Sequence, residues 1–98
     1  MPKRNKKARQ FDGPLSASAL RQWLIEDLAA RIEVDPADID TGKSFEDYGL
    51  DSRAAVQISG ILEKIVERRL SPGLLYEHET IDDLSAYLAQ ELHLADQV

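Results

Sequence analysis

Apolar residues recur every three or four positions in three separate segments of this chain, and nowhere do they alternate with polar residues as in a strand. The first segment begins at Ser16 or Ser18, either of which can cap a helix, and runs to about Glu33. Val34-Asp35-Pro36 ends it, because proline lacks an amide donor and disfavours helical backbone in the residue before it. The apolar positions of this helix are Leu20, Trp23, Leu24, Leu28 and Ile32.

A second helix is predicted to begin at Ser52 and to continue to about Arg68 or Arg69, where cations favour the negative end of the helix dipole. Gly60 lies inside this helix at a cost of about 1 kcal/mol relative to alanine. It marks either a close approach by another backbone or a partner, or simple tolerance. The apolar stripe of the helix is Ala55, Ile58, Leu62, Ile65 and Val66.

Two further helical elements are predicted near the end of the chain. Ser71-Pro72-Gly73 opens a turn, so Leu74-Leu75-Tyr76 is predicted to form a single helical turn or a 3₁₀ piece. Thr80, with Asp83 three residues later, has the form of a helix N-cap and starts a last helix of about 12 residues. The predicted fold is therefore all-α, a small four-helix bundle with three main helices and one short one.

A long loop is predicted between the first two main helices, from Val34 to Asp51. Its apolar residues, Ile39, Phe45 and Leu50, are too sparse for a strand and are expected to pin the loop onto the core. A connection of this length without secondary structure of its own is uncommon in a compact domain and is usually functional.

The 98 residues, 43% of them hydrophobic, are enough for one modest core. We expect a basic, flexible tail over residues 1–14, a folded domain over 15–94 and a short C-terminal tail over 95–98. The chain has no cysteine, so neither a disulfide nor a thiolate metal site can form. No apolar run approaches the length of a membrane span, and the N-terminus lacks the apolar stretch of a signal peptide, so we expect a cytoplasmic protein that does not bind membranes. We also expect a monomer.

The charge is unevenly distributed along the chain. Residues 11–98 contain seven basic and all 18 acidic residues, a net charge of −11. Such a field disfavours nucleic acid and favours partners with basic surfaces. The basic tail is either a solubilising extension or a contact for nucleic acid or an acidic partner. Its basic residues are Lys3, Arg4, Lys6, Lys7 and Arg9.

Patterns typical of enzymes are scarce. His78 and His93 have no accompanying metal-ligand pattern, and neither is positioned by the sequence to activate Ser52. The carboxylates are more simply a solvated acidic surface than a general acid and base. We therefore predict a protein without catalytic residues and without a metal site.

Gly49-Leu50-Asp51-Ser52 joins the long loop to the second helix. As a helix start, Asp51 is the expected N-cap, Gly49 permits a sharp entry and Leu50 anchors the loop. Capping does not explain why a long, pinned loop should deliver the hydroxyl of Ser52 to an exposed helix start.

GLDS at positions 49–52 resembles the phosphopantetheine attachment motif of the acyl carrier protein family. The resemblance covers about residues 16–93 and includes the helix order, the spacing from Asp38 through Phe45 to Ser52, and the ETIDDL segment that contains Thr80. It implies that a phosphopantetheinyl transferase, using coenzyme A and Mg²⁺, attaches 4′-phosphopantetheine to Ser52, directly after the motif residue Asp51. A phosphate suits this position because helix N-termini favour anions. The arm would supply the thiol that the chain lacks.

The resemblance implies a non-catalytic carrier that holds acyl groups as thioesters in polyketide or related fatty-acyl biosynthesis. Its expected partners are the transferase, an acyl-loading enzyme such as an acyl-AMP ligase or acyltransferase, and a ketosynthase or other synthase domain. The alternatives are a peptidyl or aryl carrier of nonribosomal peptide synthesis, which more often has a GGxS-type motif, and an acidic helical interaction module without an arm. The predicted partner contacts are Leu50, Arg53, Val56, Gln57, Gly60, Glu63 and Tyr76.

One residue departs from the family pattern. The position after the serine is often apolar, but here it is Arg53, which with Lys64, Arg68 and Arg69 makes the second helix mixed in charge. DSRAAV together with LSPGLLYEHETI is more similar to carrier domains of bacterial polyketide assembly lines than to a fatty-acid carrier.

Overall fold

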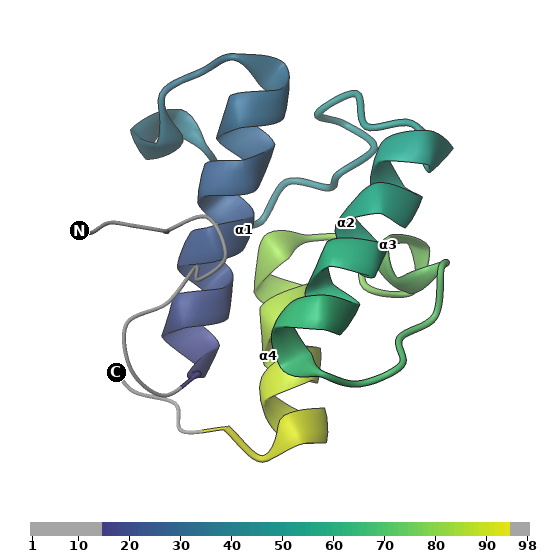
Figure 1. Cartoon of the computed structure of the whole chain (residues 1–98). Coiled ribbons are helices and arrows are strands. Elements are labelled where there is room, and N and C mark those ends of the chain that lie inside the picture. Colours follow the sequence, from purple (N-terminus) through teal and green to yellow (C-terminus); the bar gives the residue numbers. More distant parts are fainter. Residues whose placement is uncertain (1–14, 95–98) are drawn as a thin grey trace, which may run out of the picture.

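The computed structural model describes residues 15–94, which form four α-helices and one 3₁₀ turn (Figure 1). The elements are α1 (Ala17–Ile32), η2 (Pro36–Asp38), α2 (Ser52–Val66), α3 (Leu74–Glu77) and α4 (Ile81–Leu92). The described residues contain no named strand, only an isolated antiparallel bridge between Ser44 and Thr80. The prediction of an all-α fold with three main helices and one short one is confirmed.

The three main helices begin at side-chain caps. Ser16, and not Ser18, caps α1, where its Oγ accepts a hydrogen bond of 3.1 Å from the amide of Ala19. Asp51 caps α2 and Thr80 caps α4, as predicted. Local sequence therefore determines where each main helix starts.

The predicted end of α2 at Arg68 or Arg69 is wrong. The helix ends at Val66 because Glu67 adopts left-handed backbone (φ 57°), and the amide of Arg68 donates to the carbonyl of Glu63. The two arginines therefore follow the helix and are not part of its last turn.

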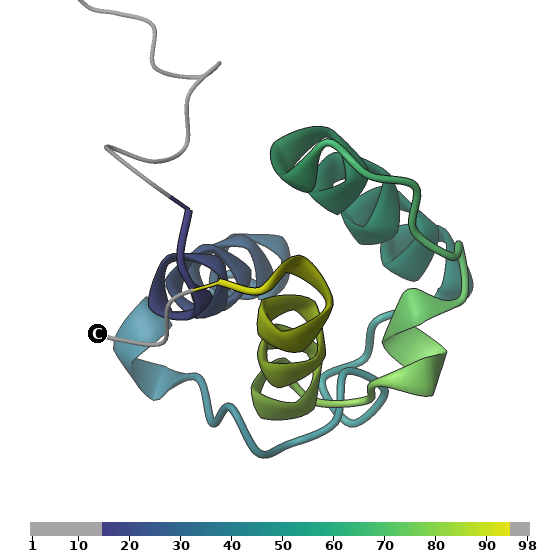
Figure 2. The same ribbon diagram turned by 90° about the horizontal axis from the view of Figure 1, so that it is seen from below.

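The helices enclose a single apolar core. α4 packs beside α1, and α3 beside α2, and Figure 2 shows α4 between the two sides of the molecule. α2 buries Ala55, Ile58 and Leu62 of its predicted stripe, while Ile65 and Val66 pack partly buried at the margin. The largest fully buried side chains are Leu20, Leu24, Leu28, Ile58, Leu62, Leu74, Ile81, Leu84 and Leu88.

The long loop between α1 and α2 is pinned, as predicted, but it is not free of secondary structure. Pro36–Asp38 form the 3₁₀ turn η2, which Asp35 caps by accepting a hydrogen bond from the amide of Ala37. Phe45 is only 4% exposed, and Ile39 and Leu50 pack partly buried against the core. The loop thus reaches α2 along a fixed path.

None of the helices described over residues 15–94 is long and apolar enough to span a bilayer. Residues 1–14 and 95–98, which include the predicted tails, lie outside the described residues.

Candidate functional site

Ser52 is exposed and is the first residue of α2, at the end of the pinned loop. Gly49 enters this junction with a positive φ of 89°, a conformation that suits glycine. The Oδ1 atom of Asp51 then accepts a hydrogen bond of 2.9 Å from the amide of Ala54. The backbone therefore turns sharply into the helix and leaves the Ser52 side chain accessible.

The amides at the start of α2 are only partly used. Ala54 donates to the side chain of Asp51, and Ala55 donates to its carbonyl at 3.0 Å. Within residues 15–94, the amides of Ser52 and Arg53 have no acceptor, and the first turn contains no acidic side chain. Unpaired amides and the positive end of the helix dipole favour an anion here, so the residues present fit a phosphate on Ser52.

The loop holds this helix start in place through backbone hydrogen bonds. The amide of Leu50 donates to the carbonyl of Phe45 at 3.2 Å, and the amide of Phe45 donates to the carbonyl of Glu79 at 2.8 Å. Another hydrogen bond lies within the loop, where the amide of Asp40 donates to the hydroxyl of Tyr48 at 2.6 Å. The position of Ser52 is therefore tied to the start of α4.

The predicted partner contacts divide into two groups. Arg53, Val56 and Tyr76 are exposed, the last two with 50% and 56% of their surface accessible. Gly60 is open, because a Cβ built there would meet no atom within 4 Å, so no other backbone of the described residues approaches it.

The other group makes contacts within the molecule. Glu63 is half-buried, and its Oε2 atom accepts a hydrogen bond of 2.7 Å from the amide of Leu70. Gln57 is exposed but accepts a hydrogen bond from Arg31 of α1. Leu50 is half-buried at the loop end. These side chains help to hold α2 in place as well as flanking the site.

A narrow cavity of about 30 Å³ lies beside the start of α2, between the loop and α3. Leu50 and Tyr76, two of the predicted partner-contact residues, both line this cavity. Sequence reasoning did not identify this cavity, although the short apolar turn after Gly73 contributes Leu75 and Tyr76 to it. Its lining residues are Ser44, Phe45, Glu46, Leu50, Ala55, Leu75, Tyr76 and Glu79.

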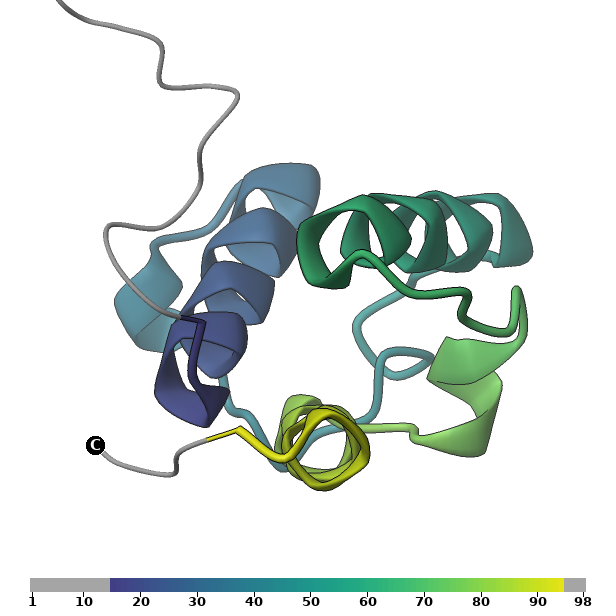
Figure 3. The ribbon, with the colours of Figure 1, turned by 60° about the horizontal axis from the view of Figure 1, so that its bottom comes forward.

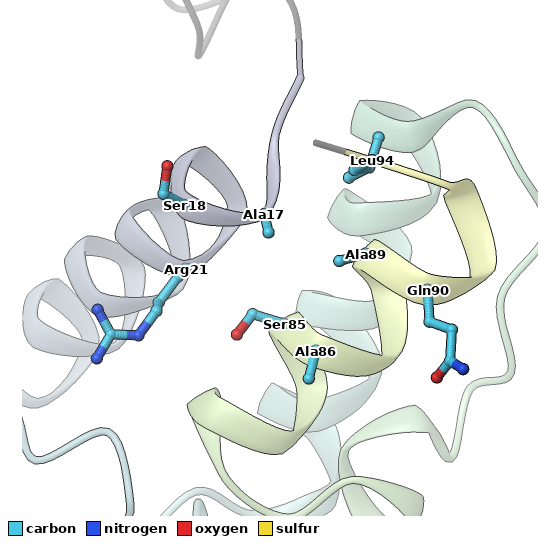
Figure 4. Close-up of a pocket in the computed structure, with 8 residues that line it drawn as sticks. All are labelled: Ala17, Ser18, Arg21, Ser85, Ala86, Ala89, Gln90 and Leu94. Atoms are coloured by element: carbon cyan, nitrogen blue, oxygen red, sulfur yellow. The ribbon is translucent and has the colours of Figure 1, made fainter. Parts of the chain in front are cut away.

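A larger hollow of about 490 Å³ lies between the start of α1 and the second half of α4 (Figure 4). Small side chains such as Ala17, Ala86 and Ala89 leave this space, and Ser85, whose hydroxyl donates a hydrogen bond to the carbonyl of Ile81, also lines it. Figure 1 shows these helix ends on the side of the molecule opposite the start of α2. The hollow is therefore separate from Ser52.

Both histidines have positions that serve the fold. The ring of His78 stacks on that of Tyr87 with centroids 4.0 Å apart, and His93 follows α4 as its C-cap. Over residues 15–94, no group of three or more histidine and carboxylate side chains is arranged to hold a metal ion.

Comparison with known proteins identifies relatives of this arrangement. A model of the family described as "Phosphopantetheine attachment site" matches residues 22–88, which include Ser52. A phenolphthiocerol/phthiocerol polyketide synthase of Mycobacterium tuberculosis is 44% identical over 78 residues, which cover 79% of this chain. The chain spans only about 4% of the length of that relative.

Solved structures share both fold and sequence. An acyl carrier protein from Anabaena with a variant phosphopantetheinylation-site sequence superposes with a TM-score of 0.75 at 36% identity, over 83% of this chain and 92% of that one. A free-standing peptidyl carrier protein from Acinetobacter baumannii gives a TM-score of 0.73 at 35% identity, over 79% of this chain and 96% of that one. The chain thus belongs to the phosphopantetheine attachment family of carrier proteins, whose covalent group is 4′-phosphopantetheine.

Proposed function

We propose that this chain is an acyl carrier protein of polyketide or related fatty-acyl biosynthesis, with 4′-phosphopantetheine attached to Ser52 Oγ. The observation that carries the proposal is the exposed Ser52 hydroxyl beside two unpaired helix amides, at the end of a loop held on the core. The polyketide assignment is supported by the relative from Mycobacterium tuberculosis, which is a polyketide synthase.

The chain contributes position and charge to the loading reaction. In loading, Ser52 Oγ would bond to the phosphorus of the phosphopantetheine half of coenzyme A as the pyrophosphate bond breaks and the nucleotide half leaves, and the serine proton would pass to a base of the transferase. The unpaired amides of Ser52 and Arg53 favour the resulting phosphodiester. Asp51 keeps the helix start folded through its bond to Ala54. Once bound, the arm supplies the thiol that holds an acyl group as a thioester.

The proposed partners are a phosphopantetheinyl transferase, an acyl-AMP ligase or acyltransferase that loads the arm, and a ketosynthase or other synthase domain. Each must approach the start of α2, where Arg53, Val56 and Tyr76 are exposed. We propose that the chain acts as a monomer in the cytoplasm and that it has no catalytic residue of its own.

The peptidyl carrier similarity favours a second candidate, a carrier of amino acids in nonribosomal peptide synthesis. Leu50 and Asp51 before Ser52 argue against it, because such carriers more often show a GGxS-type motif. Loading assays decide between the two. A ligase that transfers a fatty acid but no amino acid to the arm supports the acyl carrier.

Intact mass spectrometry tests the attachment. The chain is incubated with coenzyme A, Mg²⁺ and a broad-specificity phosphopantetheinyl transferase, and we expect a mass gain of one phosphopantetheine group. Ser52→Ala should gain nothing, whereas Ser18→Ala, a matched change of an exposed serine on α1, should gain it fully. No gain by the natural chain, or an equal gain by Ser52→Ala, would contradict the proposal and favour an interaction module without an arm.

A further inference from the structure

The charge of the described residues is divided between two parts of the molecule. Residues 52–69, which form α2 and its exit, contain four basic and two acidic side chains, a net charge of +2. Residues 15–51 and 70–94 together contain three basic and fourteen acidic side chains, a net charge of −11. The helix that begins at Ser52 is therefore the cationic part of an acidic domain.

Within residues 15–94, the three cations that lie outside residues 52–69 have partners in the molecule. Arg21 pairs with Asp82 at 3.2 Å, Arg31 pairs with Asp27 at 2.7 Å, and the Lys43 ammonium lies 4.6 Å from the centre of the Tyr48 ring. Over residues 15–94, the ion pairs involve none of the four cations of α2 and its exit. These four exposed side chains, which we term the cationic face, are Arg53, Lys64, Arg68 and Arg69.

The cationic face extends along the outer side of α2. Arg53 and Lys64 are eleven residues apart, or about three helical turns and about 16 Å, so they point in nearly the same direction. Gly60 lies between them and presents no side chain to obstruct a partner. Within the described residues, α1, α3 and α4 leave the outer side of α2 uncovered (Figure 3).

The two acids of this segment do not neutralise the face. Glu63 is half-buried and accepts the amide of Leu70, so its carboxylate stabilises the chain after α2. Of the two acids, only Glu67 is exposed, and it lies beside the cations in the sequence. It shares with Lys64, Arg68 and Arg69 the rim of a shallow, open hollow of about 270 Å³, which Glu63 also lines.

We propose that the cationic face is a docking surface that selects enzymes whose own docking surface is acidic. The inference rests on the proposed function, since an enzyme that acts at Ser52 must approach the first turn of α2, where the face begins with Arg53. Unpaired cations on a surface free of covering elements attract an Asp/Glu-rich patch and repel a Lys/Arg-rich one. The net charge of the whole chain, −6, would indicate the opposite preference.

The test uses one broad-specificity phosphopantetheinyl transferase in two forms. The first has a Lys/Arg-rich carrier-docking surface, and in the second those residues are replaced by glutamate. Loading of Ser52 is followed by intact mass at subsaturating carrier to give kcat/KM, and kcat at saturating carrier checks that the second form is active. We expect the natural chain to be loaded with a kcat/KM about tenfold higher by the acidic form, and this preference should shrink at high salt.

Two variants, each of which replaces one lysine with glutamate, show which part of the surface causes the preference for the acidic transferase. Lys64→Glu lies on the cationic face but about 18 Å along the helix from Ser52, so it alters docking and not the reacting atoms. It should lower kcat/KM about threefold with the acidic form and raise it about threefold with the basic form. Lys43→Glu, on the loop between α1 and α2, should change neither value.

The outcomes separate the two proposals. A natural chain that gains no mass with either form contradicts attachment at Ser52. Normal loading with equal or better efficiency from the basic form, or equal effects of Lys64→Glu and Lys43→Glu, leaves the carrier function intact and overturns the docking preference.

Discussion

The starts of α2 and α4 are built alike but are used differently. In both helices the N-cap side chain accepts the amide three residues later, Asp51 from Ala54 at 2.9 Å and Thr80 from Asp83 at 3.0 Å. The first turn of α4 then contains two acids, whereas that of α2 contains none. The first turn of α4 is therefore already supplied with negative charge, whereas at the start of α2 the only carboxylate is that of the N-cap Asp51.

The start of α4 is occupied by contacts within the molecule. Ile81 is fully buried, the amide of Asp82 donates to the carbonyl of Thr41, and the Asp82 carboxylate pairs with Arg21. At α2, by contrast, Ser52 and Arg53 are exposed and make no such contacts with any other residue of the range 15–94. A capped helix start can therefore serve either to assemble the fold or to receive a group from outside.

The largest predicted effect comes from removing the buried side chain that supports the loop leading to the start of α2. Phe45→Ala should lower the free energy of unfolding by about 3 kcal/mol, because it empties a buried site beneath the loop between α1 and α2, which is hydrogen-bonded to Glu79 just before α4. Chemical denaturation measures this cost. Tyr76→Ala, which removes an exposed aromatic ring, should cost no more than about 0.5 kcal/mol. Equal costs would show that the loop does not depend on Phe45.

The second prediction compares the two caps directly. Asp51→Ala and Thr80→Ala should each lower the free energy of unfolding by about 1 kcal/mol, because each leaves a helix amide without its acceptor. Only Asp51→Ala should also slow loading by the transferase. Asp51→Asn keeps a capping oxygen, so normal stability with slow loading would show that the transferase reads the carboxylate. Normal stability and normal loading of Asp51→Ala would refute both roles.

The smallest predicted effect makes the start of α2 resemble that of α4. Arg53→Glu should raise the free energy of unfolding by about 0.3 to 0.5 kcal/mol, because an acid now faces the positive end of the helix dipole. The same carboxylate should lower the kcat of loading, measured at saturating carrier so that docking does not contribute, by repelling the phosphates of coenzyme A. Arg53→Gln is the neutral control and should have a smaller effect on both measurements. A higher kcat for Arg53→Glu at saturating carrier would contradict the anion-binding role of this helix start.

The parts of the fold that depend on neighbouring residues could be predicted from the sequence. Asp51 and Thr80 are capping residues followed by helical periodicity, and the apolar spacing of α2 identified the side that is buried. The end of α2 could not be predicted, because Glu67 adopts a left-handed conformation that glycine or asparagine usually supplies.

The site was only partly predictable for a similar reason. Capping and periodicity indicated an exposed helix start, but the attachment role of Ser52 came from a family resemblance. The bond between Arg31 and Gln57 and the bridge between Ser44 and Thr80 join residues far apart in sequence, so no local pattern encodes them. The same holds for the cavity between the loop and α3.

The open surroundings of Gly60 make it a suitable position for a spectroscopic label. The chain has no cysteine, so Gly60→Cys would introduce its only side-chain thiol, in the middle of the cationic face. A Cβ there meets no other atom, and cysteine has a higher helix propensity than glycine, so the fold should tolerate the change. A fluorophore or spin label attached before the arm is loaded would report directly on partners that approach α2.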